Sequence, residues 1–199
     1  MEIAGRNLTD YCQKLLLEAG HSFTSSAALE TVKDIKEKHC YVAQNWEQES
    51  ADAEASPSND VQYTLPDKAV ITVPGLLRMK TPELLFKPEL NGFTCSSLHA
   101  LAWKSVQGSD LDVRKDLLKN VILSGGTTMY EGISDRLKSE ITTLAPAGSE
   151  IRMVCQPDRK FAVWKGASTL CSLSTFAASW ISQEEYEEHG AAIVHRKCA

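Results

Sequence analysis

Two glycines set between a short apolar strand and an amphipathic helix constrain the fold of this chain more than any other feature. Residues 120–123 (NVIL) have the composition of a short buried strand, and SGGTTMY follows directly at 124–130. The helix expected after this turn has one apolar face, made of Ile133, Leu137, Ile141 and Leu144. The order of the expected elements, rich in helices with strands that occur singly, indicates α/β layers.

The same turn is a candidate ligand cradle. Gly125 and Gly126 allow the backbone to approach a planar or anionic group closely, and the helix N-terminus beyond them favours negative charge. Glycines also make strand-to-helix turns for purely steric reasons. The turn taken alone therefore leaves both interpretations open.

Apolar periodicity and turn residues predict further helices, with strands that occur singly. Asn7 is expected to cap a first helix that ends at Gly20, and a second helix is expected over Ala27–Trp46. The acidic, polar segment 47–60 predicts a mobile loop. The remaining expected elements are a hairpin of strands 62–65 and 70–73 around Pro66-Asp67-Lys68, a short helix 81–86 capped by Thr81, helices 97–106 and 110–118, a strand 151–155, and helices 160–173 and 176–188.

Composition excludes several classes of protein. The net charge of −5 lacks the basic footprint of a nucleic-acid binder, and the apolar runs fall short of the ~20 residues that a membrane span needs. None of the six cysteines forms a C-x-x-C pair, so neither a metal site nor a thioredoxin-like site is expected. Since the first residues carry no apolar signal-peptide core, we expect a cytoplasmic protein, or a member of a nuclear complex, with reduced thiols.

Several blocks along the chain closely resemble actin, in actin's order and at nearly its spacing. On these blocks the chain is identified as a member of the actin family, with a resemblance that runs from residue 1 to residue 199 and drifts at the acidic segment and at 74–110. The blocks are AGRNLTDY at 4–11, KDIKEKHCYVA at 33–43, RKDLLKNVILSGGTTMYEGISDRLKSEITTLAP at 114–146, DRKFAVWKGASTL at 158–170 and IVHRKC at 193–198.

This resemblance implies an α/β, actin-like nucleotide-binding fold of the kind shared with Hsp70 and sugar kinases. The chain matches the second lobe of that fold together with the C-terminal helices of the first lobe. On this match residues 1–93 are the outer subdomain of the second lobe, 94–160 are part of its inner subdomain, and 161–199 are the helices that belong to the first lobe.

The resemblance also implies one side of a nucleotide site. Gly5 matches the glycine near the sugar, and Lys36 and Glu37 match the pair beside the ribose and adenine, with Lys33 where actin usually has arginine. The residues that match the adenine-side loop and the lysine against the base are Gly125, Gly126, Thr127, Met129, Tyr130 and Lys160.

The other side of that site has no match in these 199 residues. Neither the DNGSG-type phosphate loop nor any DxG motif occurs in the sequence. Phosphoryl transfer depends on positioning and charge stabilisation of the terminal phosphates, so this chain alone is not expected to be catalytic. ATP or ADP with Mg2+ is the cofactor implied for the complete protein, a slow ATPase, and tight binding by this chain alone is not expected.

Two departures from actin lie at positions that bear on assembly, and both altered partner choice and neutral surface drift remain open as explanations. Leu90, Asn91 and Phe93 match the loop that plugs between filament strands, where Asn91 replaces an aliphatic residue. The groove in which partner helices dock is matched by Lys165, Thr169, Leu170, Leu173 and Ser179, with polar residues at three positions that are apolar in actin. The implied partners are other actin or actin-like subunits and actin-binding proteins, with no direct nucleic-acid or membrane contact.

Two functions remain open on this sequence. The first is an actin-like cytoskeletal protein that binds ATP and forms filaments or complexes when complete. The second is a truncated actin-like scaffold or interaction subunit without nucleotide function. An enzyme of the wider sugar-kinase and Hsp70 superfamily is disfavoured, because the matching blocks are specific to actin.

Overall fold

The computed structural model describes residues 3–56 and 59–198. The chain divides into two compact units, Met1–Lys160 and Phe161–Ala199, and each is described by itself. The mixture of helices with short strands agrees with the predicted α/β class. Among the helices of the described residues, none is both long enough and apolar enough to span a membrane.

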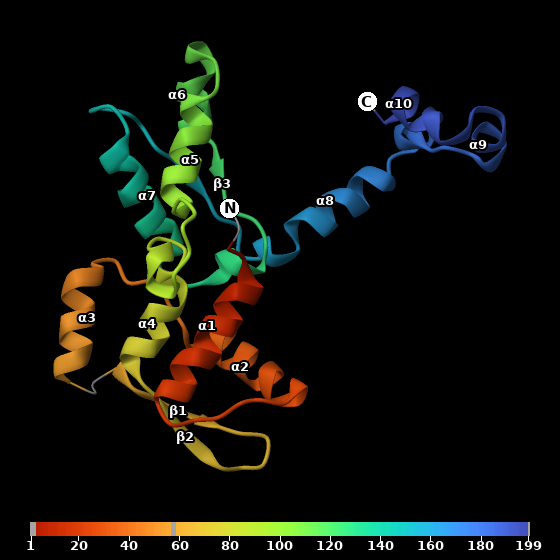
Figure 1. Cartoon of the computed structure of the whole chain (residues 1–199). Coiled ribbons are helices and arrows are strands. Elements are labelled where there is room, and N and C mark those ends of the chain that lie inside the picture. The colour runs from red at the N-terminus through yellow and green to blue at the C-terminus, as the bar shows by residue number, and fades with distance from the viewer. Residues whose placement is uncertain (1–2, 57–58, 199) are drawn as a thin grey trace. The chain divides into compact units, whose positions relative to one another are not determined.

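Helix α1 (Gly5–Glu18) is the centre of the first unit and packs against α2 (Ser26–His39) and α4 (Gly75–Glu83), as Figure 1 shows. Its buried residues recur every three or four positions, which is the apolar periodicity from which this helix was predicted. They are Leu8, Tyr11, Cys12, Leu15 and Leu16.

The predicted start of α1 is wrong. The backbone is extended at Ala4 and helical from Gly5, so Asn7 lies inside the first turn. Its Oδ1 accepts a hydrogen bond from the Ala4 N–H over 3.0 Å. Asn7 therefore satisfies a backbone donor of the helix start from within the helix, rather than as the residue that precedes it.

The predicted long helix and the loop after it are also wrong. α2 ends at His39, because the backbone is extended at Cys40, Tyr41 forms a parallel β-bridge with Glu131, and the Val42 N–H donates to the Glu131 carbonyl over 2.9 Å. A separate helix, α3 (Trp46–Ala55), then occupies most of the segment expected to be a loop. Composition predicted no burial there, and α3 indeed buries none of its residues.

Three interactions order α3 in place of burial. The Asn45 side chain caps it by accepting a hydrogen bond from the Gln48 N–H, and Glu47 pairs with Lys87 over 2.7 Å. The Lys87 ammonium also lies 5.9 Å from the centre of the Trp46 ring. Lys87 belongs to the segment that follows α4. Figure 1 shows α3 lying beside α4.

The hairpin prediction is confirmed. β1 (Val61–Thr64) pairs antiparallel with β2 (Val70–Val73), and Lys68 in the turn has a φ of 72°. The helix expected over 81–86 instead begins at Gly75, after the extended Pro74. Thr81 is consequently not a cap: it is buried within α4 and its hydroxyl donates to the Leu77 carbonyl over 2.9 Å.

The rest of the first unit follows the predicted order of elements. α5 (Leu98–Gln107) packs against α7 (Ile133–Leu144), and β3 (Val121–Ile122) pairs in parallel with β4 (Met153–Val154). The shorter helical pieces are η2 (Pro88–Asn91), η3 (Leu111–Val113), α6 (Arg114–Lys119), η4 (Gly126–Met129) and η5 (Arg159–Phe161), the last of which crosses the division between the units.

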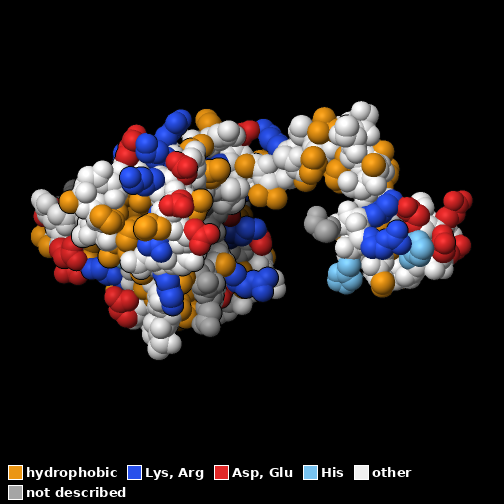
Figure 2. Space-filling model, turned by 90° about the horizontal axis from the view of Figure 1, so that it is seen from above, with side chains coloured by type: hydrophobic (Ala, Val, Ile, Leu, Met, Phe, Trp, Pro, Cys, Tyr) orange, Lys and Arg blue, Asp and Glu red, His pale blue; other side chains and the backbone are white. Residues whose placement is uncertain are grey.

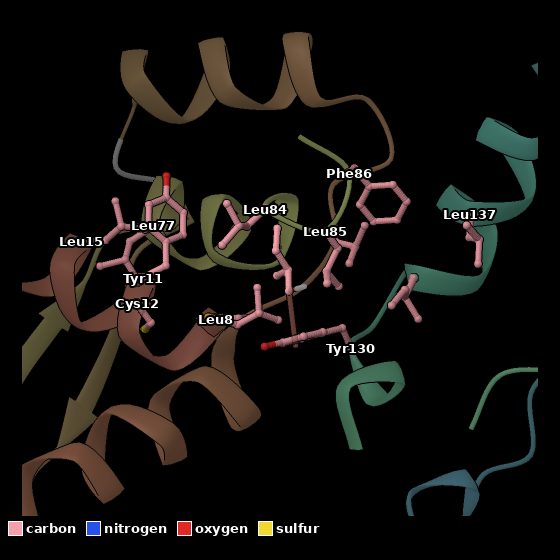
Figure 3. Close-up of a cluster of buried hydrophobic side chains, with 14 of the residues drawn as sticks. Leu8, Tyr11, Cys12, Leu15, Leu77, Leu84, Leu85, Phe86, Tyr130 and Leu137 are labelled. Carbon is pink, nitrogen blue, oxygen red and sulfur yellow. The ribbon is translucent and has the colours of Figure 1, made fainter. Parts of the chain in front are cut away.

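The core of the first unit joins distant segments. Figure 3 shows Leu8, Tyr11 and Leu15 of α1 facing Leu77 of α4 and the neighbouring Leu84, with Tyr130 and Leu137 farther along the same cluster. These residues are almost completely removed from solvent.

A buried ion-pair network crosses this core. Arg136 on α7 donates from Nη2 to Glu83 Oε1 over 2.9 Å, from Nε to Glu140 Oε1 over 2.7 Å, and from Nη1 to the Ala43 carbonyl over 2.6 Å. The guanidinium also lies 4.9 Å from the centre of the Phe86 ring. Burial raises the pKa of Glu83 to about 7, although Arg136 acts in the opposite direction.

The loop predicted to plug between filament strands packs on its own unit. Leu90 and Phe93 lie partly buried against the core, and the Tyr11 hydroxyl donates to the Leu90 carbonyl over 3.5 Å. Asn91 Oδ1 accepts a hydrogen bond from Lys14 Nζ over 3.3 Å. A role of this loop in assembly stays a prediction.

The second unit is helical, as predicted, in shorter pieces. They are α8 (Ala162–Cys171), η6 (Ser174–Ser179), α9 (Gln183–His189), η7 (Gly190–Ile193) and α10 (Val194–Lys197). Ser182 caps α9 by accepting from the Glu185 N–H, and Lys197 pairs with Glu185 over 2.6 Å while donating to the Trp180 carbonyl. This pairing holds the last helix against the start of α9.

Candidate functional site

A cleft of about 810 Å³ opens in the first unit, a volume within the ~300–1,000 Å³ range of small-molecule sites. Three segments far apart in sequence form it: the first turns of α1, one face of α2, and the stretch from η4 to Tyr130. Lys160, the middle residue of η5, completes the lining. The lining residues are Gly5, Arg6, Thr9, Asp10, Leu29, Glu30, Lys33, Lys36, Glu37, Gly126, Thr127, Met129, Tyr130 and Lys160.

Helix α2 presents one face to the cleft. Leu29, Lys33 and Lys36 are spaced by four and three residues, which places them in one row along the helix. Lys33 pairs with Glu30 over 3.2 Å, and both side chains are well exposed at the mouth of the cleft. The same wall is therefore lined by apolar Leu29, by the Lys33–Glu30 ion pair and by the more deeply buried Lys36.

Lys36 is the buried charge of this wall, with 6% of its surface exposed. Its Nζ donates to the Gly5 carbonyl over 3.0 Å and to Thr9 Oγ1 over 2.8 Å. The Thr9 hydroxyl in turn donates to the Gly5 carbonyl over 3.0 Å. Burial lowers the pKa of Lys36, and Lys33 adds to this while Glu37 opposes it.

The two glycines of the turn have different tasks. Gly125 has a φ of +93°, a conformation that L side chains rarely adopt, and its N–H donates to the Arg159 carbonyl over 2.9 Å. The Arg159 guanidinium donates from Nε and Nη2 to the Thr128 carbonyl, over 3.0 and 2.8 Å. Gly125 thus shapes and anchors the turn, while Gly126 lines the cleft.

A third glycine allows α1 to approach this turn. A Cβ placed on Gly5 would lie 3.0 Å from Thr127 Oγ1, which is tighter than ordinary contacts between these atoms. Glycine at position 5 therefore lets the first turn of α1 approach η4 without displacing the Thr127 side chain.

The opposite wall combines apolar and charged groups. Met129 is 40% exposed, and Lys160 Nζ lies 3.5 Å from Glu37 Oε2 with both side chains about half exposed. Tyr130 is buried, and its hydroxyl has no hydrogen-bond partner among the residues that the structure describes. Burial raises the pKa of this phenol well above its ordinary value.

The cleft gathers most of the residues that the sequence singled out for nucleotide binding. All of the predicted nucleotide-binding residues line it except Gly125, which lies beside it. Sequence reasoning missed Arg6, Thr9, Asp10, Leu29 and Glu30. Helical spacing from Gly5 and Lys33 could have found Thr9, Leu29 and Glu30, since positions three or four apart share a helix face. Nucleotide binding by this set stays a prediction.

Metal ligands are not gathered in the described part of the chain. No group of three or more histidine, cysteine, aspartate or glutamate side chains is arranged there to hold a metal ion. Since these residues do not fit the Mg2+ that the resemblance implies for the complete protein, we derive no step through it.

A smaller cavity of about 430 Å³ lies in the second unit and is lined by Phe161, Trp164 and Lys165. Of the predicted groove residues, Lys165 lines this cavity, and Thr169 donates from Oγ1 to the Lys165 carbonyl one turn along α8. The other predicted groove residues do not line it; they are Leu170, Leu173 and Ser179. Figure 2 shows hydrophobic side chains exposed along this part of the unit, and Trp164 is 70% exposed. Partner docking on this face stays a prediction.

Comparison with models of protein families gives a match over residues 1–199 to the family described as Actin.

Proposed function

The chain belongs to the actin family, and from this premise we propose that its first unit supplies the adenosine-side wall of a nucleotide-binding site. One observation supports the proposal above all others. Residues that the resemblance assigned to nucleotide, from α1, α2, η4, Tyr130 and η5, line a single cleft of about 810 Å³.

The chemistry of the cleft suits an adenosine group with an anionic end. Met129 and Leu29 offer apolar surface to a base. The Glu37 carboxylate can accept hydrogen bonds from sugar hydroxyls or an amino group, and the Lys36 ammonium can donate to sugar or phosphate oxygens. Lys33 adds positive charge, although its pairing with Glu30 offsets part of it.

We propose that residues 1–199 by themselves bind ATP weakly, with a Kd of about 1 mM or higher, and do not hydrolyse it. Charge-assisted hydrogen bonds to the terminal phosphates carry much of the affinity for a nucleotide. The resemblance assigns the loops that make those bonds to a lobe that this sequence does not match. In the complete protein, the same wall would form part of an ATP site.

The test is a titration of the 199-residue chain with ATP, followed by NMR. We expect the backbone signals of Thr127 and Met129 to shift at millimolar ATP. The Lys36→Met variant should weaken binding, and Lys104→Met, at an exposed position of α5 outside the cleft, should leave it unchanged. Absence of shifts at the cleft in the unaltered chain overturns the proposal, and micromolar binding overturns the weak affinity.

For the second unit we propose docking of partner proteins. The support is its exposed apolar surface, since large side chains such as Val163, Trp164 and Leu173 are more than half exposed. As a complete protein we propose an actin-like cytoskeletal component of the cytoplasm, or of a nuclear complex, that assembles with actin-like subunits. The alternative is a scaffold that keeps this surface and has no nucleotide function, and the ATP titration distinguishes the two.

A further inference from the structure

Two acceptors hold the ammonium of Lys36, and both belong to the first turns of α1. They are the Gly5 carbonyl, 3.0 Å from Nζ, and Thr9 Oγ1, at 2.8 Å. The Thr9 hydroxyl donates its hydrogen to the Gly5 carbonyl, so the hydroxyl oxygen accepts the hydrogen bond from the lysine. These three groups form a closed triangle that fixes the position of the charge.

The triangle leaves one N–H of the ammonium for a ligand. An ammonium has three donors, and within residues 3–56 and 59–198 the hydrogen bonds of Lys36 are those to Gly5 and Thr9. The side chain is more than nine-tenths buried and still lines the cleft. The third N–H is therefore available to an acceptor that lies in the cleft.

A lysine side chain has four rotatable bonds and reaches its target as a flexible point charge. Of its two acceptors, the Gly5 carbonyl belongs to the backbone and is present whatever side chains surround it. Thr9 is consequently the side chain on which the placement of this ammonium depends.

We propose that Thr9 is a positioning residue, whose hydroxyl holds the Lys36 ammonium at the floor of the cleft so that its third N–H meets an oxygen of the bound nucleotide. The ligand in this proposal rests on the proposed function. The positioning itself is a property of the free protein and can be measured without nucleotide.

Substitution of Thr9 by valine is the informative change, because valine keeps the shape and removes the acceptor. The buried ammonium then loses one of its two hydrogen bonds, which disfavours its charged form and lowers the pKa of Lys36 further. Serine keeps the hydroxyl and should restore the unaltered behaviour.

Helix α7 offers a matched control. Thr142 also donates from Oγ1 to the carbonyl four residues earlier, that of Lys138, over 2.7 Å, but it is exposed and lies outside the cleft. Thr142→Val removes the same kind of helical hydrogen bond without touching Lys36. This variant therefore shows how much of any effect comes from removing a threonine hydroxyl in a helix, and how much comes from removing the acceptor of Lys36.

The experiment measures the Lys36 side chain by NMR in the 199-residue chain, through a pH titration of its Cε signal, together with ATP affinity. In Thr9→Val we expect a lower pKa of Lys36 and about tenfold weaker ATP binding, which is ~1.4 kcal/mol. ATP affinity should decrease as rising pH deprotonates the Lys36 ammonium. In Thr9→Val this decrease should begin at a lower pH than in the unaltered chain, because the pKa of Lys36 is lower. Thr9→Ser and Thr142→Val should match the unaltered chain in all three measurements.

An unchanged Lys36 titration in Thr9→Val overturns the positioning role. An altered titration with unchanged ATP affinity overturns the contact with nucleotide. If the unaltered chain binds no ATP, the proposed function fails, and the Lys36 titration still decides whether Thr9 positions the lysine.

Discussion

Removing the guanidinium of Arg136 should cost the first unit about 4 kcal/mol of stability. The Arg136→Met variant leaves Glu83, whose exposed fraction is 0%, without its partner, and it leaves the Ala43 carbonyl without the 2.6 Å hydrogen bond. Breaking a buried ion pair by removing one partner typically costs ~3–5 kcal/mol. A domain of this kind has only ~5–15 kcal/mol in total, so the effect should be large in urea unfolding.

The pH dependence identifies the cause. The pKa of Glu83 is about 7 in the folded chain against 4.5 for an ordinary glutamate, so the folded state keeps its proton longer and stability falls as pH rises between these values. Arg136 lowers the pKa of Glu83, and its loss should therefore raise this pKa further. The penalty of Arg136→Met should be smaller at pH 5, where Glu83 is neutral, than at pH 8.

Two further variants make the experiment decisive. Glu83→Gln added to Arg136→Met removes the unpaired charge and should recover about 2 kcal/mol at pH 8. Arg152→Met, at an exposed arginine, should change stability by less than ~0.5 kcal/mol. A loss below about 1 kcal/mol at pH 8 for Arg136→Met, or a loss equal at both pH values, would refute the reasoning.

Three other changes test the structure elsewhere. Gly125→Ala should cost ~1–3 kcal/mol in thermal unfolding, because φ is +93° and ψ 161° there, and a cost equal to that of Gly166→Ala on α8 would contradict this. Asn45→Ala should raise amide exchange across α3 and leave α4 unchanged, since its side chain caps α3 alone. Lys165→Ile in the complete protein should bind an apolar actin-binding helix at least about tenfold tighter, measured by titration, because burying an ammonium is costly; equal affinity would rule out a place for Lys165 in the docking surface.

Local patterns sufficed for the elements whose signal is contained within a few residues. Local hydrophobic periodicity predicted the apolar face of α1. Local turn residues predicted the hairpin of β1 and β2 and the strand, glycine turn and helix around Gly125. The blocks at 33–43 and 114–146 likewise indicated the family and half of the residues that line the cleft, because motif residues can be matched without knowing where they lie in space.

Contacts between distant segments decided what the sequence alone predicted wrongly. The end of α2 depends on Val42 donating to Glu131, and the order of α3 depends on Lys87 reaching Glu47. Neither partner lies within the window in which helical periodicity is read, so a continuous helix and then a loop were the expected outcomes.

The same limit applies to the site and the core. The helix periodicity shows which residues share a face of α1 or α2, but only the packing of these helices puts Thr9 within 2.8 Å of Lys36. Glu83 and Arg136 each appear as ordinary charged helix residues in the sequence, and only tertiary structure buries them together. Local sequence thus determined the faces, and long-range packing determined which faces meet, because the energy of burial is set by neighbours that the chain brings together only when it folds.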